Sequence, residues 1–278
     1  MTLNQRIQAF YDQSTPLWLD VWGEHMHHGF YPDGKVGTKT HIQAQFDLVE
    51  EMLRWGEVEK ANHVLDAGCG VGGSARLLAK KYDAQVLALT LSPVQAANGQ
   101  RYNREAGLEK QVTIEAKDMM RFVDSDQKFD LIWSMESAEH ILDKKALMDM
   151  FYQLLNPGGR LIMATWCHRD EPPVLASSEQ RLLEKIYGLY HLPPMVSISD
   201  LELMAKSAGF KEVRSADWSD AVAPFWKAVI QSVFQWKSIK GLMKAGWSTI
   251  QGAWAMRYMT KGYEKGIIKF GVFQAKKI

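Results

Sequence analysis

Cysteine is scarce in this chain of 278 residues. Its two cysteines, Cys69 and Cys167, lie far apart, and neither belongs to a pair with metal-ligand spacing. This scarcity excludes a disulfide scaffold and favours a reducing compartment. Apolar runs of eighteen or more residues are also absent, so the sequence predicts no membrane-spanning helix. The N-terminal stretch MTLNQRIQAF lacks the apolar core of a signal peptide, and we therefore expect a cytoplasmic protein.

Net charge is equally low. A formal charge of +1 at pH 7 gives the molecule as a whole no electrostatic attraction to nucleic acid. The charge is uneven, however, because residues 224–278 contain ten Lys or Arg and one acid, Glu264, and therefore carry +9 against −8 for the rest. Trp226, Trp236, Trp247 and Trp254 lie in the same segment. This pattern suits peripheral contact with a membrane surface or a lipophilic ligand, and it is equally typical of a solvated helical face whose tryptophans enter the core.

Three histidines, His25, His27 and His28, lie within four positions in the stretch WGEHMHHGF. Such a cluster raises the question of a metal site. A structural zinc needs four nitrogen or sulfur ligands, and no CxxC pair or further His pair accompanies the cluster. We therefore predict no metal here and expect the histidines to handle protons or to orient a substrate.

Short apolar stretches alternate with helical segments through most of the chain. The stretches that we interpret as strands are 62–67, 85–92, 111–118, 128–135, 160–166, 211–218 and 266–276. Strands separated by helices of this length predict a seven-stranded, Rossmann-like α/β fold with right-handed crossovers, a parallel sheet and helices on both faces.

Two helices, over 3–22 and 39–55, precede the first strand, and Pro16 is expected to interrupt or restart the first of them. Two insertions, at 168–198 and 220–264, follow the fifth and sixth strands. Because loops after the strands line the ligand crevice of such sheets, these insertions are candidates for a substrate lid. The sequence thus predicts an N-terminal helical cap, a nucleotide-binding core, and lid insertions interleaved with the last strands, over 1–58, 59–167 and 168–278 respectively.

The loop VLDAGCGVGG matches GxGxxG through Gly68, Gly70 and Gly73. That pattern alone would also fit a dinucleotide. Asp66 precedes the first glycine by two residues, where its charge would repel a pyrophosphate but attract the ammonium group of a bound amino acid. The second strand ends in Thr-Leu-Ser (90–92), without the acidic residue that a nicotinamide ribose needs.

Asp118 and Met119, after the third predicted strand, offer an acceptor for an adenine amine and an apolar contact for the adenine ring. Together with Asp66 and the glycine loop they favour S-adenosylmethionine over NAD as the ligand.

Several longer stretches resemble one family. They are FYDQSTPLWLDVWGEHMHHGFY, LDAGCGVGGSA, LTLSPVQ, WSMESAEHI, NPGGRLIMATWCHR, ADWSDAVAPFW and GYEKGIIKFG. Essentially end to end, the chain resembles the class I S-adenosylmethionine-dependent methyltransferases, in the branch of the γ-tocopherol methyltransferases, relatives of sterol and cyclopropane-fatty-acid methyltransferases. WGEHMHHG and ATWCHR are far more specific than the glycine loop.

The resemblance implies S-adenosylmethionine as cofactor and S-adenosylhomocysteine as its product. The implied cofactor-binding residues come from the cap, the glycine loop and the strand ends: Tyr11, Trp22, Asp66, Gly68, Cys69, Gly70, Gly72, Thr90, Leu91, Gln95, Asp118, Met119 and Ser134. The candidate bases that could deprotonate a phenol are Glu136, His140, His168, His27 and His28. Substrate contacts are expected from His25, Tyr31, Trp226 and Trp247.

The resemblance implies methylation of a hydrophobic aromatic small molecule, on a ring carbon of a γ-tocopherol-type chromanol. An N-methyltransferase for an indole or another alkaloid-type natural product is the alternative within the same fold. A non-catalytic module that binds S-adenosylmethionine is the alternative from another class. The branch further implies a cyanobacterial or plastid-type enzyme without a visible transit peptide.

Overall fold

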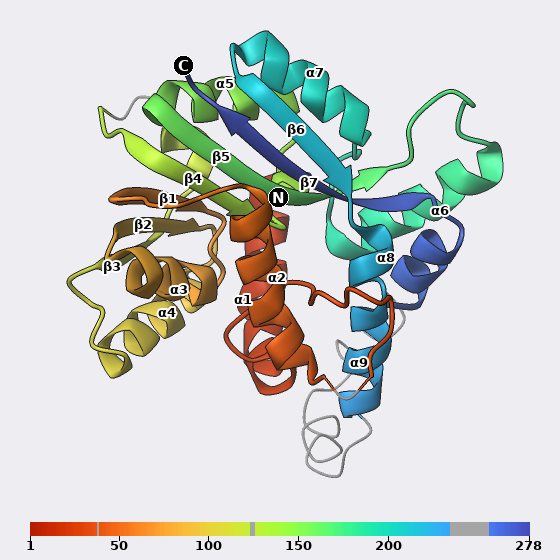
Figure 1. Ribbon diagram of the computed structural model, residues 1–278. Helices are drawn as coiled ribbons and strands as arrows, with labels where there is room; N and C mark the ends of the chain where they lie inside the picture. The colour runs from red at the N-terminus through yellow and green to blue at the C-terminus, as the bar shows by residue number, and fades with distance from the viewer. Residues whose placement is uncertain (38, 123–125, 234–255) are drawn as a thin grey trace.

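A seven-stranded sheet forms the centre of the molecule in the computed structural model, which describes residues 1–37, 39–122, 126–233 and 256–278 (Figure 1). The strands are β1 (His63–Ala67), β2 (Gln85–Thr90), β3 (Val112–Ala116), β4 (Phe129–Met135), β5 (Leu155–His168), β6 (Lys211–Asp217) and β7 (Ile268–Lys276). They lie in the order β3-β2-β1-β4-β5-β7-β6. Each predicted strand is found, which confirms the Rossmann-like fold class. From β1 the chain passes to β2 on one side of the sheet, whereas from β4 it passes to β5 on the other side.

β7 runs antiparallel to both of its neighbours, β5 and β6. The other neighbouring strands pair in parallel. The sheet is therefore mixed, and the prediction of a parallel sheet was wrong for its last strand. Apolar alternation is the same whichever way a strand runs, so the pattern of residues 266–276 did not carry this information.

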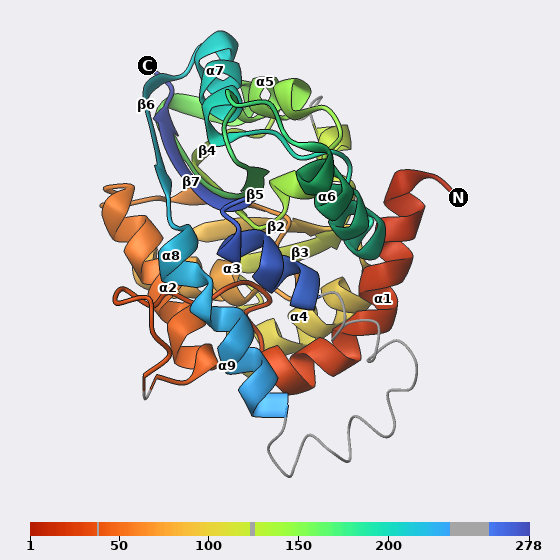
Figure 2. The same cartoon turned by 90° about the vertical axis from the view of Figure 1, so that its right-hand side faces the viewer.

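Helices cover both faces of the sheet (Figures 1 and 2). Leu147 in α5 (Lys144–Leu154) shares a core with Leu65 of β1, whereas Leu48 in α2 (His41–Trp55) shares a second core with the adjacent β1 residue Val64. Because successive strand residues point to opposite faces, β1 is apolar on both sides. The helices are α1 (Leu3–Trp22), α2 (His41–Trp55), α3 (Gly73–Tyr82), α4 (Pro93–Glu105), η1 (Met119–Phe122), η2 (Ala138–His140), α5 (Lys144–Leu154), α6 (Ser177–Tyr190), α7 (Ile198–Ala208), α8 (Ser219–Val222) and α9 (Pro224–Val233).

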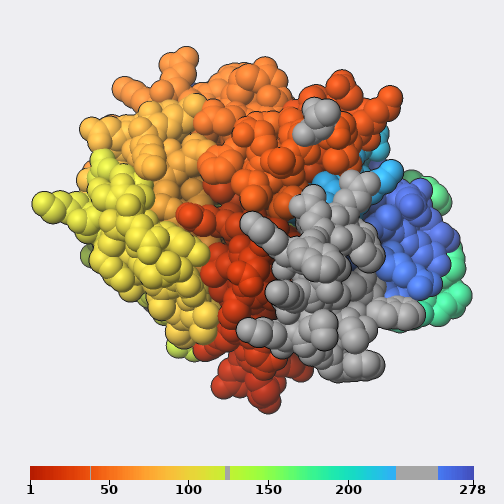
Figure 3. All heavy atoms as spheres, turned by 90° about the horizontal axis from the view of Figure 1, so that it is seen from below, coloured from red at the N-terminus to blue at the C-terminus, as the bar shows by residue number. Residues whose placement is uncertain are grey.

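α1 continues through Pro16 as one helix, contrary to the predicted interruption, and changes direction along its length (Figure 2). The hydroxyls of Ser14 and Thr15 donate to the carbonyl oxygens of Phe10 and Tyr11. Side-chain hydrogen bonds of this kind can bend a helix without ending it, and so can a proline. α1 contacts α4 and α9. Seen from below, the red surface of α1 lies between the yellow surface that includes α4 and the orange surface of the cap residues that follow α1 (Figure 3).

The two insertions carry α6 and the pair α8 and α9. α9 packs against α1 and α2, so the part of the second insertion up to residue 233 joins the cap. At this junction the ring of Phe225 lies 5.2 Å from that of Trp22. Trp236, Trp247 and Trp254 lie outside the described residues. Among the residues that are described, no helix combines the length and the apolar character needed to cross a bilayer.

Candidate functional site

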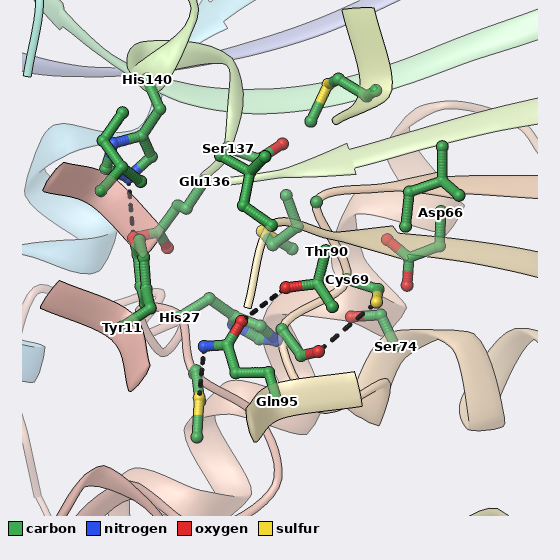
Figure 4. Close-up of a pocket in the computed structure, with 18 of the residues that line it drawn as sticks. Tyr11, His27, Asp66, Cys69, Ser74, Thr90, Gln95, Glu136, Ser137 and His140 are labelled. Atoms are coloured by element: carbon green, nitrogen blue, oxygen red, sulfur yellow. Dashed lines mark hydrogen bonds between the residues drawn. The ribbon is translucent and has the colours of Figure 1, made fainter. Parts of the chain in front are cut away.

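A pocket opens at the carboxyl ends of β1, β2 and β4, under the N-terminal cap (Figure 4). Its empty volume is about 920 Å³, part of it open to solvent, which suits a small-molecule site. The lining comes from α1, the segment that follows it, the glycine loop, and the residues at the ends of β2, β3 and β4. The pocket therefore occupies the point where the sheet connections change direction, the usual ligand position in such folds.

The glycine loop brings backbone to the pocket wall. Gly68 and Gly70 have φ angles of 96° and 55°, which residues with a side chain rarely adopt. A Cβ atom on Gly68 would lie 2.1 Å from Cβ of Ser137, and one on Gly73 would lie 2.4 Å from the carbonyl oxygen of Glu24. Glycine is thus needed both for the turn and for the close approach of the cap and the segment after β4.

Asp66 lies at the pocket, near the end of β1 (Figure 4), and is 1% exposed. Its carboxylate accepts a hydrogen bond from the backbone of Ala75. Within the described part of the chain, its Oδ2 atom has no hydrogen-bond partner. Burial raises the pKa of Asp66 to about 7, against smaller lowering effects of the Ala75 bond and of Arg76. A cation bound beside Oδ2 would offset the cost of this buried charge.

Thr90 and Gln95 form a hydrogen-bonded pair where β2 leads into α4. The Thr90 hydroxyl donates to Oε1 of Gln95 over 2.7 Å, and the backbone N–H of Gln95 donates to the Ser92 hydroxyl over 3.0 Å. Nε2 of Gln95 lies 3.6 Å from Sδ of Met26 in the cap. The Ser92 hydroxyl in turn donates to Asp12 of α1. The cap and the start of α4 are therefore held together around one side of the pocket.

Asp118 is hydrogen-bonded to the first turn of α1. Its Oδ2 accepts from Nδ2 of Asn4 over 2.8 Å, and its Oδ1 accepts from the backbone N–H of Met120 over 3.0 Å. Asn4 and Met119 both line the pocket beside it. The start of the cap thus closes the side of the pocket formed by Asp118 and Met119.

Glu136, in the left-handed region at φ 48°, lies between the pocket and a buried cluster of aromatic rings. Its Oε1 accepts the backbone N–H of His28 over 2.7 Å. Its Oε2 accepts Nδ1–H of His28 over 2.7 Å and Nε1–H of Trp166 over 3.1 Å. Burial raises the pKa of Glu136, but the electrostatic effects of the His28 and His27 rings and the His28 hydrogen bonds outweigh it and lower the pKa. Glu136 is therefore an ionised acceptor, and Nδ1 of His28 is the donor of their side-chain hydrogen bond.

The other two histidines of the cluster, His25 and His27, are hydrogen-bonded to each other. Nδ1 of His27 donates to the carbonyl oxygen of His28 over 2.8 Å, which leaves Nε2 of His27 to accept from Nδ1 of His25 over 3.1 Å. Gln45 of α2 donates to the carbonyl oxygens of His25 and His27. Burial lowers the pKa of both His25 and His27, so both rings are neutral. Across the described residues, no three His, Cys, Asp or Glu side chains are arranged to hold a metal ion.

The pocket gathers many of the predicted site residues. Those that line it are Tyr11, Asp66, Gly68, Cys69, Gly70, Thr90, Leu91, Gln95, Asp118 and Met119 from the cofactor set, His27, Glu136 and His140 from the base set, and His25 from the substrate set. Predicted residues that do not line it are Trp22, Gly72, Ser134, His28, His168, Tyr31 and Trp226. Trp247 lies outside the described residues.

The predicted residues outside the lining have identifiable contacts. Trp22 stacks on Trp18 with 5.6 Å between the rings. The Ser134 hydroxyl lies 3.0 Å from that of Ser137, behind the pocket wall. His168, at the end of β5, donates from Nδ1 to the carbonyl oxygen of Arg169. These three side chains therefore support neighbouring elements.

Gly73, the third glycine of the GxGxxG pattern, also lines the pocket. The sequence analysis missed further lining residues: Asn4, Ile7, Glu24, Met26, Ser74, Leu89, Lys117, Met135, Ser137 and Ile141. Met26 lies within the histidine cluster and Ser137 directly follows Glu136, so both stood beside a predicted residue. Asn4 and Ile7 had no such signal, because only the folding of α1 over the core brings them to the pocket.

Comparison with known proteins gives a consistent result. The family model described as mycolic acid cyclopropane synthetase matches residues 2–230. A probable tocopherol O-methyltransferase, chloroplastic, from Oryza sativa subsp. japonica is 43% identical over 99% of this chain and 78% of its own length. Norajmaline N-methyltransferase from Rauvolfia serpentina is 30% identical over 98% of both chains. A solved structure of a cyclopropane synthase from Mycobacterium tuberculosis has a TM-score of 0.83 at 20% identity, over 99% of this chain and 98% of its own.

Proposed function

Because the chain belongs to the mycolic acid cyclopropane synthetase family, in its tocopherol methyltransferase branch, we propose that it methylates a ring carbon of a γ-tocopherol-type chromanol. The family gives the reaction class: the protein is an S-adenosylmethionine-dependent methyltransferase that acts on hydrophobic substrates. The proposal concerns the identity of the acceptor, the atom that is methylated and the roles of single residues.

The residues of the pocket fit S-adenosylmethionine. The unpartnered Oδ2 of Asp66 suits the cofactor's ammonium group, since a buried carboxylate without a partner is costly. Gly68 and Gly70 would accommodate the methionine part, and the polar atoms of Thr90 and Gln95 would contact the ribose. Asp118 and Met119 would hold the adenine. The cofactor supplies an electrophilic methyl group on a sulfonium, and the chain contributes orientation and the exclusion of water.

The observation that carries the acceptor proposal is the buried aromatic cluster beside Glu136. The rings of Trp166, Phe225 and Phe270 lie 5.9, 5.3 and 5.4 Å from the ring of His28. Aromatic side chains packed beside Glu136, which itself lines the pocket, favour an acceptor with a flat aromatic head group. The name of the rice relative supports a chromanol acceptor.

A nitrogen acceptor is the second candidate, since the Rauvolfia relative is named an N-methyltransferase and aligns over 98% of this chain. Incubation with labelled S-adenosylmethionine, γ-tocopherol, a prenylated benzoquinol and an indole amine separates the two candidates. We expect label on the chromanol, with NMR locating the new methyl group on a ring carbon. Label on the indole amine alone would disprove the chromanol proposal.

We also propose that residues 224–278 contact a membrane surface, in a plastid or cyanobacterial setting. The support is the segment's ten basic residues against one acid and its four tryptophans, together with the chloroplastic location in the name of the rice relative. Trp226 itself is only 2% exposed and is therefore not an interfacial anchor.

Pelleting with anionic lipid vesicles tests the membrane proposal. A variant with Lys237, Lys240 and Lys244 changed to Gln should pellet less than the wild type, because each basic residue near an anionic surface contributes about 1 kcal/mol. A variant with the exposed Lys60, Lys80 and Lys110 changed to Gln serves as the control with the same net charge. Equal pelleting of both variants would reject the proposal.

A further inference from the structure

Three buried polar atoms next to Glu136 have no hydrogen-bond partner among the described residues: Nε2 of His28, the hydroxyl of Tyr263 and Nε1 of Trp226. They belong to one cluster, because the ring of His28 lies 5.0 Å from that of Trp226 and 6.0 Å from that of Tyr263. A buried polar group without a partner costs about 1–3 kcal/mol. Two of these groups beside the imidazole that carries the third indicate a place for a polar ligand group.

The proton positions in this cluster follow from its contacts. Nδ1–H of His28 donates to the ionised Glu136 carboxylate, so Nε2 is the ring nitrogen left to accept a hydrogen bond. The indole N–H of Trp226 can only donate. Burial raises the pKa of Tyr263 well above its usual value, and its hydroxyl therefore stays protonated. The cluster offers one acceptor and two donors.

A phenol hydroxyl is the complement of this set. It presents one donor hydrogen and two acceptor lone pairs, so all three cluster atoms can be paired at once. An indole N–H or an amine lacks the two lone pairs and would leave at least one buried donor without a partner. The hydrogen-bonding pattern therefore discriminates between the two acceptor classes, which the apolar rings around it do not.

We propose that Nε2 of His28, the hydroxyl of Tyr263 and Nε1 of Trp226 bind the hydroxyl group of a phenolic acceptor, and that His28 removes the proton of that hydroxyl. This inference rests on the proposed function. The O–H bond breaks, the proton moves to Nε2, and the electron pair stays on the phenolate oxygen, which accepts hydrogen bonds from Tyr263 and Trp226. The Glu136 carboxylate stabilises the resulting imidazolium, as an acidic residue does behind a histidine base.

The same arrangement specifies which acceptor atom is methylated. Glu136 lines the cofactor pocket, whereas His28, Tyr263 and Trp226 do not. The acceptor oxygen is therefore held beside the pocket, and a neighbouring ring carbon, which shares the phenolate charge, enters it. After that carbon has gained the methyl group it releases its hydrogen as a proton to water. The phenolate so restored takes its proton back from His28, and one proton leaves overall.

Tyr263→Phe is the first test, because it removes a hydroxyl that has no partner within the described residues. We expect unchanged thermal stability and unchanged affinity for S-adenosylhomocysteine, with kcat/KM for γ-tocopherol lowered about tenfold to a hundredfold, the effect of losing a hydrogen bond to a charged group. Tyr82→Phe is the matched control. Tyr82 donates to the carbonyl oxygen of Val58 over 2.8 Å away from the pocket, so this variant should lose stability and keep activity.

His28→Asn is the second test, because its amide can still donate to Glu136 while Nε2 is gone. We expect kcat to fall about a hundredfold or more, with affinity for S-adenosylhomocysteine retained. Calorimetry with a tail-free chromanol in the presence of S-adenosylhomocysteine measures the subsite without turnover. Binding should weaken about tenfold in Tyr263→Phe, whereas the corresponding ligand without the hydroxyl group should bind equally to the variant and the wild type.

The possible failures are distinguishable. If the wild type methylates chromanols and both Tyr263→Phe and His28→Asn do so at the wild-type rate, the proposed hydroxyl subsite is wrong and the proposed function stands. An O-methylated product would overturn the assignment of the oxygen to a position beside the pocket. A wild-type protein that neither binds nor methylates a chromanol would overturn both the subsite and the proposed function.

Discussion

The hydroxyl of Tyr11 lies 2.7 Å from Nε2 of His140 and joins the cap helix α1 to the η2 turn after β4 (Figure 4). Burial raises the pKa of Tyr11 beyond its usual range and lowers the pKa of His140 to about 3, so both rings are neutral. Both residues line the pocket. This hydrogen bond therefore holds the cap against the pocket wall without carrying a charge.

Tyr11→Phe should weaken binding of S-adenosylhomocysteine about threefold to tenfold, the effect of one lost neutral hydrogen bond. His140→Ala should act through the same contact. A double-mutant cycle on the dissociation constant, measured by calorimetry, is therefore expected to show a coupling free energy of about 0.5–1.5 kcal/mol. Strictly additive effects would mean that the hydrogen bond does not support the bound cofactor.

Asp66→Asn should abolish cofactor binding and raise the stability of the protein without ligand. The folded pKa of about 7 lies above the usual value of 3.8, so the folded state holds a proton that the unfolded state releases, and stability falls as pH rises from about 4 to 7. Asn avoids this cost and can still accept from Ala75. Thermal unfolding at pH 8 without ligand should show a higher Tm for Asp66→Asn. S-adenosylhomocysteine should raise the Tm of the wild type only, and an equal rise in the variant would contradict the role of Asp66.

The sequence was sufficient for those features that depend on local patterns. The apolar runs predicted all seven strands, and the glycine loop with Asp66 predicted one wall of the pocket, because a turn with positive φ and a carboxylate at a strand end are set within a few residues. Asp118 follows the end of β3 and was found from a local pattern of the same kind, whereas Gln95, in the first turn of α4, was named only because the family resemblance implied it.

Contacts between distant segments were not predictable in this way. The pairing of Glu136 with His28 spans 108 positions, and that of Asn4 with Asp118 spans 114. Each depends on how α1 and the segment after it fold over the sheet. Tyr263 lies in the stretch GYEKGIIKFG that resembles the family, but nothing in the sequence singled out its hydroxyl, since a single tyrosine before a strand looks like an ordinary packing residue. The direction of β7 was missed because direction leaves no trace in strand alternation.

Glu139→Gln should change the pH dependence of stability. Glu139 is 1% exposed and its Oε2 accepts from the Thr165 hydroxyl over 2.8 Å. Burial, and secondly the charge of Glu136, raise the pKa of Glu139 from 4.5 to about 8. The folded state therefore keeps a proton that the unfolded state loses, and wild-type stability declines as pH rises from about 4.5 to 8. Urea unfolding should show an advantage of the Gln variant that grows over this range and levels off above it. A constant difference at all pH values would contradict the raised pKa.

Gly73→Ala should displace the cap from the glycine loop. A Cβ atom at this position would lie 2.4 Å from the carbonyl oxygen of Glu24 and 3.0 Å from Nδ1 of His25. Because backbone cannot yield as a flexible side chain does, overpacking should cost about 1–3 kcal/mol of unfolding free energy. The shift would also move the segment that carries His28, so kcat should fall.

Gly188→Ala is the matched control for this substitution. Gly188 lies within α6, and a Cβ atom there meets nothing within 4 Å. Alanine should therefore stabilise the helix by about 0.5–1 kcal/mol and leave methyl transfer unchanged. Urea unfolding and steady-state kinetics on both variants give the comparison. If Gly73→Ala retained wild-type stability and rate, the close packing of the cap on the glycine loop would be disproved.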